Sequence, residues 1–210
     1  MEYADYSLQK FADTLSSENP TPGGGSAAGV NGSLAASLLL MVIRVTNKSP
    51  ELESLEDLLE AKKEKALELI DEDAESFNQV MEAFRMPQET EEQREKRRQK
   101  IQSTFKNAAA TPLEMLELAV EMAEIAVDVA EKGNPNAVTD AAAGAIAAKA
   151  AADTAYYNVM INLESIEDEK FVERVGSKAY NLKQKAEKVK AQVIDTTEDN
   201  IEILGRDWHE

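Results

Sequence analysis

The spacing of apolar residues constrains this 210-residue chain more than any other feature of its sequence. Apolar side chains recur every three or four residues along almost the whole chain, and no segment alternates strictly between apolar and polar residues. The first pattern is typical of amphipathic helices, whereas the second would indicate half-buried strands. We therefore expect an all-α fold, a single-domain bundle of long antiparallel helices, because helices of this length usually pack side by side.

Prolines, glycines and asparagine-rich turns divide the chain into its expected helices. In chain order these are Ser7–Leu15, Ala27–Thr46, Leu52–Arg85, Pro112–Lys132, Ala137–Ser165 and Asp168–Ile203. A charged segment, Glu89–Asn107, leads into Pro112, which we place in the first turn of a new helix because no backbone N–H is needed there. No linker is long enough to separate two domains, so residues 1–210 are expected to form one domain with a loose tail at 205–210.

The composition excludes several classes of function. A formal net charge of −17, from 40 acidic and 23 basic residues, disfavours binding to nucleic acid or to an anionic membrane. The chain has no cysteine, and its single histidine, His209, lies in the tail, so thiol, histidine and metal chemistry are not expected. Ala27–Val45 imitates a membrane span, but its bulky apolar run, Leu38–Ile43, is too short to cross a bilayer. Without a signal-peptide pattern, a cytoplasmic location is expected.

Three consecutive glycines, Gly23, Gly24 and Gly25, stand between Pro22 and Ser26. A chain keeps such a costly run where its backbone takes unusual dihedral angles or comes very close to another group. We place Ser26 at the N-cap of the next helix, so that several backbone N–H groups point out of the loop together. With the helix dipole, such a start suits a carboxylate, a phosphate or an electron-rich heterocycle. The alternative is a tight surface turn with a good cap.

A carboxylate interrupts the apolar stripe of the expected helix Leu52–Arg85. Asp73 falls on this stripe between Ile70 and Phe77, whereas Asp71 can turn outward. A carboxylate on a core-facing stripe is costly unless it is paired or used. Asp73 is therefore either a structural partner of Lys63 or of an amide on another helix, or a functional group.

A stripe of small residues on the expected helix Ala137–Ser165 has polar residues at both ends. Asp140 lies at its start, and Asn158 and Asn162 lie one turn apart near its end. An acid in a first helical turn also complements the helix dipole, so Asp140 alone is ambiguous. Asparagine is a poor helix former, and the repeated pair either locks helices together or binds a polar ligand.

Several motifs follow one another along residues 7–200. They are Pro20-Thr21-Pro22-Gly23-Gly24-Gly25-Ser26, Asp71-Glu72-Asp73-Ala74, Ile101-Gln102, Ala110-Thr111-Pro112-Leu113, Gly133-Asn134-Pro135-Asn136, Thr139-Asp140-Ala141 and Asn158-Val159-Met160-Ile161-Asn162-Leu163. In this order they resemble the cyclodeaminase/cyclohydrolase family, which includes the methenyltetrahydrofolate cyclohydrolases and the C-terminal domain of formiminotransferase-cyclodeaminase. The resemblance implies an all-helical homodimer with a folate substrate, no cofactor and no metal. No formiminotransferase domain is present, and the tail Gly205–Glu210 has no counterpart that we can place.

The resemblance implies hydrolysis of 5,10-methenyltetrahydrofolate to 10-formyltetrahydrofolate. The methenyl bridge is a delocalised cation, which a buried carboxylate can stabilise while it takes a proton from the attacking water. Burial raises the pKa of such a carboxylate, and the positive charge of the substrate counters that shift. We expect Asp73 to lie at the reacting carbon. Asp140 would be the second carboxylate, either a proton shuttle or an acceptor for the pterin N–H groups.

The remaining candidate residues would bind the substrate. Asn158 and Asn162 would hold the pterin carbonyl or the water, and Asn134 would add a further contact. The Gly23–Gly25 amides and Ser26 would receive the pterin edge or the glutamate carboxylates.

Other interpretations of the sequence remain open. A formiminotetrahydrofolate cyclodeaminase that releases ammonia would use the same groups. A non-catalytic helical scaffold would explain the long helices, but it would explain neither the triple glycine nor Asp73 within an apolar stripe. A folate-binding protein without turnover is a third alternative.

Overall fold

The computed structural model describes residues 2–47 and 50–201, and all regular structure within them is helical. The elements are η1 (Tyr3–Asp5), α1 (Leu8–Leu15), α2 (Gly24–Arg44), α3 (Pro50–Phe84), α4 (Glu91–Lys132), η2 (Pro135–Ala137), α5 (Val138–Leu163) and α6 (Glu169–Asp199), where η marks a short 3₁₀ helix. The predicted all-α class is confirmed. The predicted end of the last helix at Ile203, the tail and His209 lie outside the described residues.

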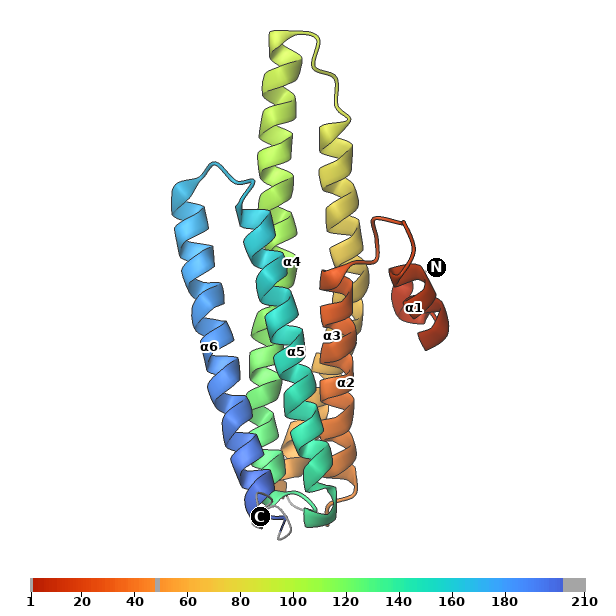
Figure 1. Ribbon diagram of the computed structural model, residues 1–210, viewed down its shortest axis with the longest axis vertical. Coiled ribbons are helices and arrows are strands. Elements are labelled where there is room, and N and C mark those ends of the chain that lie inside the picture. Colours follow the sequence, from red (N-terminus) through yellow and green to blue (C-terminus); the bar gives the residue numbers. More distant parts are fainter. Residues whose placement is uncertain (1, 48–49, 202–210) are drawn as a thin grey trace, which may run out of the picture.

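Five long helices, α2 to α6, lie side by side along the long axis and run alternately up and down (Figure 1). Helix α5 packs against α2, α4 and α6, while α2 packs between α3 and α5. Helices α3 and α4 extend beyond the others as a hairpin, and α1 stands to one side near the start of α2. The start of α2 therefore lies partway along the α3–α4 hairpin rather than at its tip.

Small residues on α2 and α5 explain how closely these helices pack. The alanines on the inward face of α5 are fully buried, namely Ala141, Ala145, Ala148, Ala151, Ala152 and Ala155.

Within the described residues, α2 alone is long and apolar enough to pass a length-and-composition test for a membrane span. Its most apolar window is 56% buried inside the bundle, and a core helix passes the same test.

Helix α4 continues through Pro112, so the prediction of a new helix at this residue is wrong. A proline inside a helix leaves the carbonyl four residues earlier without its N–H donor, and here that carbonyl belongs to Ala108. The side-chain Nδ2 of Asn162 on α5 donates to the Ala108 oxygen at 3.0 Å. A side chain from the neighbouring helix thus supplies the hydrogen bond that the proline removes.

Helix α2 begins earlier than predicted, at Gly24 with Gly23 as its N-cap residue. The prediction that Ser26 is the N-cap is therefore wrong, because Ser26 is the third residue of the helix and is fully buried. None of the glycines in the described residues has a positive φ angle. Close approach, and not an unusual dihedral angle, is the reason for Gly24 and Gly25 at this helix start.

Gly29 offers a test of the α2–α3 packing. A Cβ at position 29 would lie 2.6 Å from Ile70 Cγ1 and 2.7 Å from the Ala66 carbonyl oxygen, so we expect Gly29→Ala to destabilise the protein by about 1–3 kcal/mol. Gly176 is the matched control, because a Cβ there would make only ordinary contacts, the nearest at 3.6 Å. Gly176→Ala should stabilise the helix by roughly 0.5–1 kcal/mol. Urea unfolding measures both changes, and equal effects would contradict this account.

Candidate functional site

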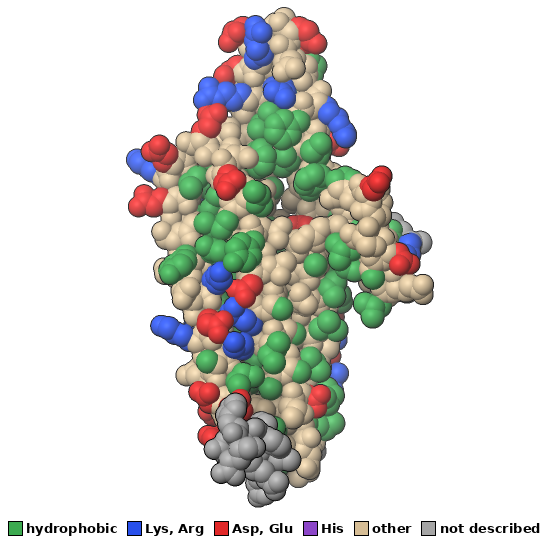
Figure 2. Space-filling view, viewed as in Figure 1, with side chains coloured by type: hydrophobic (Ala, Val, Ile, Leu, Met, Phe, Trp, Pro, Cys, Tyr) green, Lys and Arg blue, Asp and Glu red, His purple; other side chains and the backbone are tan. Residues whose placement is uncertain are grey.

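A cavity of about 440 Å³, here called the central pocket, lies where the start of α2 meets α3, α4 and α5. Its walls are largely apolar, formed by Phe77, Val80, Met81, Phe84, Phe105 and Ile161. Its polar side chains include Asp73, Ser76, Asn158 and Asn162. Figure 2 shows the hollow near the start of α2, with acidic atoms deep in it and hydrophobic side chains above. A volume of this size and an apolar lining with a few polar groups are typical of small-ligand sites.

Asp73 lies at the floor of the central pocket, where the start of α2 fixes its carboxylate. Its Oδ2 accepts hydrogen bonds from the Ser26 backbone N–H at 3.0 Å and from the Ser26 hydroxyl at 3.4 Å. The alternative partner, Lys63, instead pairs with Glu60. Asp73 Oδ1 accepts no hydrogen bond from the described residues. It is also not fully buried, because Asp153 Oδ1 is the one buried side-chain oxygen without a partner among those residues. One oxygen is therefore fixed, and the other is accessible.

Burial raises the pKa of the Asp73 carboxyl above its ordinary value of 3.8. The two hydrogen bonds from Ser26 favour the charged form and offset part of this shift. Asp73 is thus a carboxylate that is both poorly solvated and held in one orientation, as a general base requires.

Gly24 and Gly25 allow the start of α2 to fit between Asp73 and Asn158. A Cβ at position 25 would lie 1.9 Å from Asp73 Oδ1, and one at position 24 would lie 2.9 Å from Asn158 Nδ2. Gly23 is different, because a Cβ at that position would have no atom within 4 Å. Two of the three glycines are therefore required by the site itself.

The two asparagines use their amide nitrogens within the protein. Asn162 Nδ2 donates to the Ala108 and Asn158 carbonyl oxygens, and Asn158 Nδ2 donates to the Thr154 carbonyl oxygen. These carbonyl partners fix the orientation of each amide. Neither Oδ1 atom accepts a hydrogen bond from the described part of the chain, so both remain available to a ligand. The asparagines thus lock helices and can also bind, and the two interpretations of the sequence are compatible.

The polar groups of the central pocket are mainly hydrogen-bond acceptors. Asp73 Oδ1 and the two asparagine oxygens face a lining that includes no lysine or arginine among the described residues. Ser26 has no role at the ligand, because its N–H bonds to Asp73 and its hydroxyl donates to Ile70 O at 2.8 Å. The prediction that Ser26 receives substrate carboxylates is therefore wrong. The arrangement suits a ligand rich in N–H groups or positive charge.

Two predicted site residues do not reach the central pocket of their own chain. Asp140 lies in the first turn of α5, 18 residues before Asn158 and so about 27 Å from it along the helix. The backbone and side chain of Asn134 bond to Thr46 Oγ1 and to the Val45 carbonyl, which join the far end of α2 to the turn after α4. Within one chain, Asp140 and Asn134 therefore do not share a site with Asp73, contrary to the expectation from the sequence.

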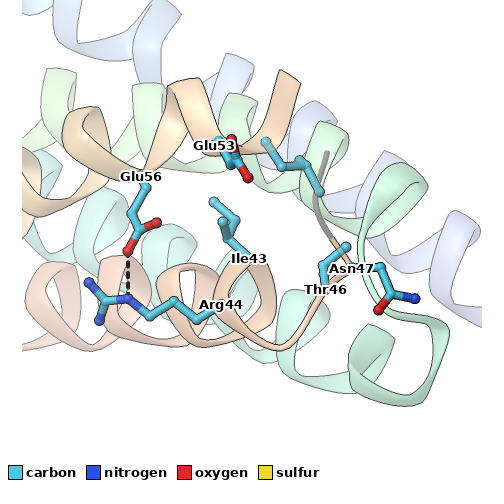
Figure 3. Close-up of a pocket in the computed structure, with 7 residues that line it drawn as sticks. Ile43, Arg44, Thr46, Asn47, Glu53 and Glu56 are labelled. Atoms are coloured by element: carbon cyan, nitrogen blue, oxygen red, sulfur yellow. Dashed lines mark hydrogen bonds and ion pairs between the residues drawn. The ribbon is translucent and has the colours of Figure 1, made fainter. Parts of the chain in front are cut away.

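A second, more polar cavity of about 220 Å³ lies near that far end, between α2 and α3 (Figure 3). Its basic residue, Arg44, is engaged by Glu56 at 2.7 Å and by Glu60 at 2.5 Å. Because these carboxylates occupy the guanidinium, and the cavity has half the volume of the central pocket, it is the weaker candidate for a ligand site.

Some lining residues were not predicted from the sequence. Phe105 lies in Glu89–Asn107, for which the sequence predicts only a charged segment, yet it packs edge-to-face on Phe84 with the ring centroids 6.0 Å apart. Ser76 reaches the lining beside Thr111, whose hydroxyl lies 3.2 Å from its own. The four-residue spacing of Ile101 and Phe105 was the available signal for this apolar face within the charged run.

Comparison with known proteins identifies the family of this chain. A model of the family described as Formiminotransferase-cyclodeaminase matches residues 7–181. The chain belongs to this family. A methenyltetrahydrofolate cyclohydrolase of Methylorubrum extorquens is 32% identical over 203 residues, which cover 92% of this chain and 97% of the relative.

Two further relatives carry the other activity in their names. The formimidoyltransferase-cyclodeaminase of Mus musculus is 29% identical, and the match covers 92% of this chain but 37% of that longer protein. The crystal structure of a formiminotetrahydrofolate cyclodeaminase from Thermotoga maritima superposes with a TM-score of 0.85 at 28% identity, covering 94% of this chain and 98% of that chain. The helical architecture is thus that of the family.

The raised pKa of Asp73 leads to a prediction about stability. A folded-state pKa above the unfolded value means that folding favours the neutral carboxyl. The stabilisation that the neutral Asp73 carboxyl gives the folded state is therefore present at low pH and is lost as the pH rises through the folded pKa. Asp73→Asn keeps an oxygen acceptor for Ser26 and removes the poorly solvated charge. We therefore expect the variant to be at least as stable as the wild type at neutral pH, and its advantage to disappear below about pH 3.9. Urea unfolding across this range measures the difference, and a variant uniformly less stable at every pH would contradict it.

Proposed function

We propose that this chain hydrolyses the cyclic amidinium bridge of 5,10-methenyltetrahydrofolate to 10-formyltetrahydrofolate, in a reversible reaction of one-carbon metabolism. The observation that carries the proposal is the acceptor-rich lining around the accessible Oδ1 of a partly buried carboxylate, Asp73. The methenyl bridge is a delocalised cation attached to a pterin with several N–H donors. A pocket with acceptors, and with no basic lining residue in the described part of the chain, complements such a molecule and disfavours an anionic ring.

Asp73 acts as the general base in the proposed mechanism. Water attacks the bridge carbon and gives one proton to Asp73 Oδ1. The product of this step is a neutral tetrahedral adduct of the substrate that carries a hydroxyl group. The bond between this carbon and N5 then breaks, the Asp73 carboxyl returns the proton to N5, and the hydroxyl of the adduct loses its own proton to solvent as the formyl C=O forms. The formyl group stays on N10. The charge of the carboxylate also stabilises the cationic substrate, and the Ser26 hydrogen bonds hold the carboxylate in place throughout.

Asn158 and Asn162 bind the pterin N–H groups through their free Oδ1 atoms, and the phenyl rings of the walls pack against the aminobenzoyl group. The reaction needs neither a metal nor an organic cofactor, because the substrate itself carries the positive charge that activates the carbon. We propose no role for Asp140 or Asn134 in the pocket of their own chain.

The methenyl chromophore gives a direct test. We expect the purified protein to accelerate the decay of 5,10-methenyltetrahydrofolate over the non-enzymatic rate, with or without a chelator. Asp73→Asn should lower this rate by roughly 10²–10⁴-fold, the usual contribution of a general base. Glu75→Gln is the matched control, because Glu75 is an exposed carboxylate two residues along the same helix. A decay rate unchanged in Asp73→Asn would remove Asp73 from the mechanism.

A second candidate function is the cyclodeamination of 5-formiminotetrahydrofolate, with release of ammonia. The raised pKa of Asp73 favours it, because a carboxyl that is protonated more readily can give a proton to the leaving amine. Two relatives carry cyclodeaminase in their names. An ammonia assay with the formimino substrate distinguishes the two functions, since cyclohydrolase activity alone releases no ammonia.

We also propose that the chain is a homodimer that pairs through the exposed face of α2 and α5. Leu34 on α2 and Ile146 on α5 are each 52% exposed, and Ile161 is 59% exposed. Few charged side chains cover α2 and its border with α5 (Figure 2). If two copies pack antiparallel on this face, the start of α5 in one copy approaches the end of α5 in the other. That arrangement would give Asp140 a role at the partner's pocket.

The dimer proposal predicts a change of mass on substitution. The wild type should sediment with twice the mass of the 23.0 kDa chain, whereas a Leu34→Glu, Ile146→Glu double variant should sediment as a monomer because it buries charge at the interface. Tyr180→Glu is the control, since Tyr180 is 53% exposed on α6, a helix outside the proposed interface. A wild-type monomer at micromolar concentration would contradict the proposal.

The remaining expectations rest on composition. We propose a cytoplasmic enzyme that binds neither nucleic acid nor membrane, because a net charge of −17 repels both surfaces.

A further inference from the structure

The tip of the α3–α4 hairpin differs in charge from the rest of the chain. Residues 85–106 contain seven lysines and arginines against four glutamates, a net +3, whereas the whole chain carries −17. Figure 2 shows both basic and acidic side chains at this end of the molecule, so the excess of positive charge is small and local. The same hairpin forms the apolar walls of the central pocket through Phe84 and Phe105. A basic surface thus lies next to a pocket that has no basic lining residue among the described residues.

Arg97 is the basic residue of this tip that lies against the pocket wall. It lies on the α4 stripe that continues through Ile101 to Phe105, and it is half-buried. Its guanidinium carbon lies 5.8 Å from the centroid of the Phe84 ring. The neighbouring arginines on α4 are paired, Arg94 with Glu91 and Arg98 with Glu167. Arg97 pairs with no carboxylate in the part of the chain that the structure describes.

The main chain fixes the orientation of the Arg97 guanidinium. Its Nε and Nη2 donate to the Phe84 carbonyl at the end of α3, at 3.2 and 3.1 Å. A guanidinium has two forks of paired N–H donors, and this contact uses only one of them. The other fork, on Nη1 and Nη2, has no partner within residues 2–47 and 50–201. A carboxylate can accept two parallel hydrogen bonds from such a fork.

We propose that Arg97 binds a carboxylate of the glutamate tail of the folate, which makes it a specificity-determining residue. This inference rests on the proposed function, because that function places the cationic bridge at Asp73. Asp73 and Phe84 are 11 residues apart on α3, about 16 Å along the helix. A folate with its bridge at Asp73 directs its aminobenzoyl group along the phenyl walls. Its glutamate then leaves the pocket at the Arg97 end.

Other parts of the pocket are unsuited to a carboxylate. The Ser26 N–H at the start of α2 is already bonded to Asp73, whose negative charge would repel a second anion. Glu164 lines the pocket on the α5 side and would repel the tail as well. The α3–α4 side of the pocket therefore attracts the glutamate. Arg85 and Lys100 of this tip also pair with no described carboxylate, but among the three only the side chain of Arg97 is held by hydrogen bonds within the described residues.

Two substrates that differ only in the glutamate test this inference. They are 5,10-methenyltetrahydrofolate and 5,10-methenyltetrahydropteroate, which lacks the glutamate. We expect Arg97→Gln to lower kcat/KM for the folate about tenfold, mainly through KM, to the level of the pteroate. Turnover of the pteroate should be unchanged, and Arg97→Lys should restore part of the loss. Arg94→Gln, which removes a paired arginine one turn away, should leave both substrates unaffected.

The same comparison separates this inference from a purely structural role. Arg97 also caps the end of α3, and a loss of packing there would lower turnover of both substrates equally. Equal losses, or a wild type that does not discriminate between the two substrates, would overturn the role of Arg97 and leave the proposed function intact. Direct titration measures binding without turnover. Tighter binding of the folate than of the pteroate, lost in Arg97→Gln, would support the inference even if neither substrate were hydrolysed.

Discussion

The site depends on the contact between Asp73 on α3 and the first turn of α2. A carboxylate at a helix N-terminus meets both the free backbone N–H groups and the positive end of the helix dipole. Here the Ser26 N–H donates to Asp73 Oδ2, and the missing Cβ of Gly25 lets the carboxylate approach the backbone. The glycine, the serine and the aspartate thus form one unit. Because position 25 has no side chain, α2 can pack against the Asp73 carboxylate. The carboxylate in turn accepts a hydrogen bond from a backbone N–H that has no acceptor within the helix.

A second structural contact determines the polarity of the pocket. Pro112 leaves the Ala108 carbonyl without a helical donor, and Asn162 supplies one from α5. Because this contact engages the amide nitrogen, the asparagine presents only its oxygen to the ligand. Asn158 donates one of its two amide N–H groups to the Thr154 carbonyl. The hydrogen bonds that complete the fold therefore engage both N–H groups of Asn162 and one of Asn158, and they leave the Oδ1 atoms of both amides as acceptors for a ligand.

The sequence predicts the helices and the inward faces of the site residues, but not how different helices are aligned along their lengths. Helical spacing places Asp73 and Asn158 on inward faces, and both line the pocket. The same spacing places Asp140 on a shared stripe with Asn158, although the rise of the helix separates them by about 27 Å. Pro112 has the pattern of a helix start, because its compensating donor, Asn162, is 50 residues away in the sequence. The first turn of α2 cannot be predicted locally, because glycine is a poor helix former and the partner that requires it lies on another helix.

The distribution of charge limits which ligand the pocket can hold, and in which direction. Net charge describes long-range attraction, but a bound molecule responds mainly to groups within a few ångströms, since salt screens charges beyond about 10 Å. In this chain the Asp73 carboxylate and the Arg97 guanidinium lie at opposite ends of one apolar wall. A ligand with a cationic ring and an anionic tail gains energy at both ends in one orientation and loses it at both ends when reversed. The bundle therefore selects the orientation of its ligand through two charges fixed by backbone contacts, Asp73 by the N-terminus of α2 and Arg97 by the C-terminus of α3.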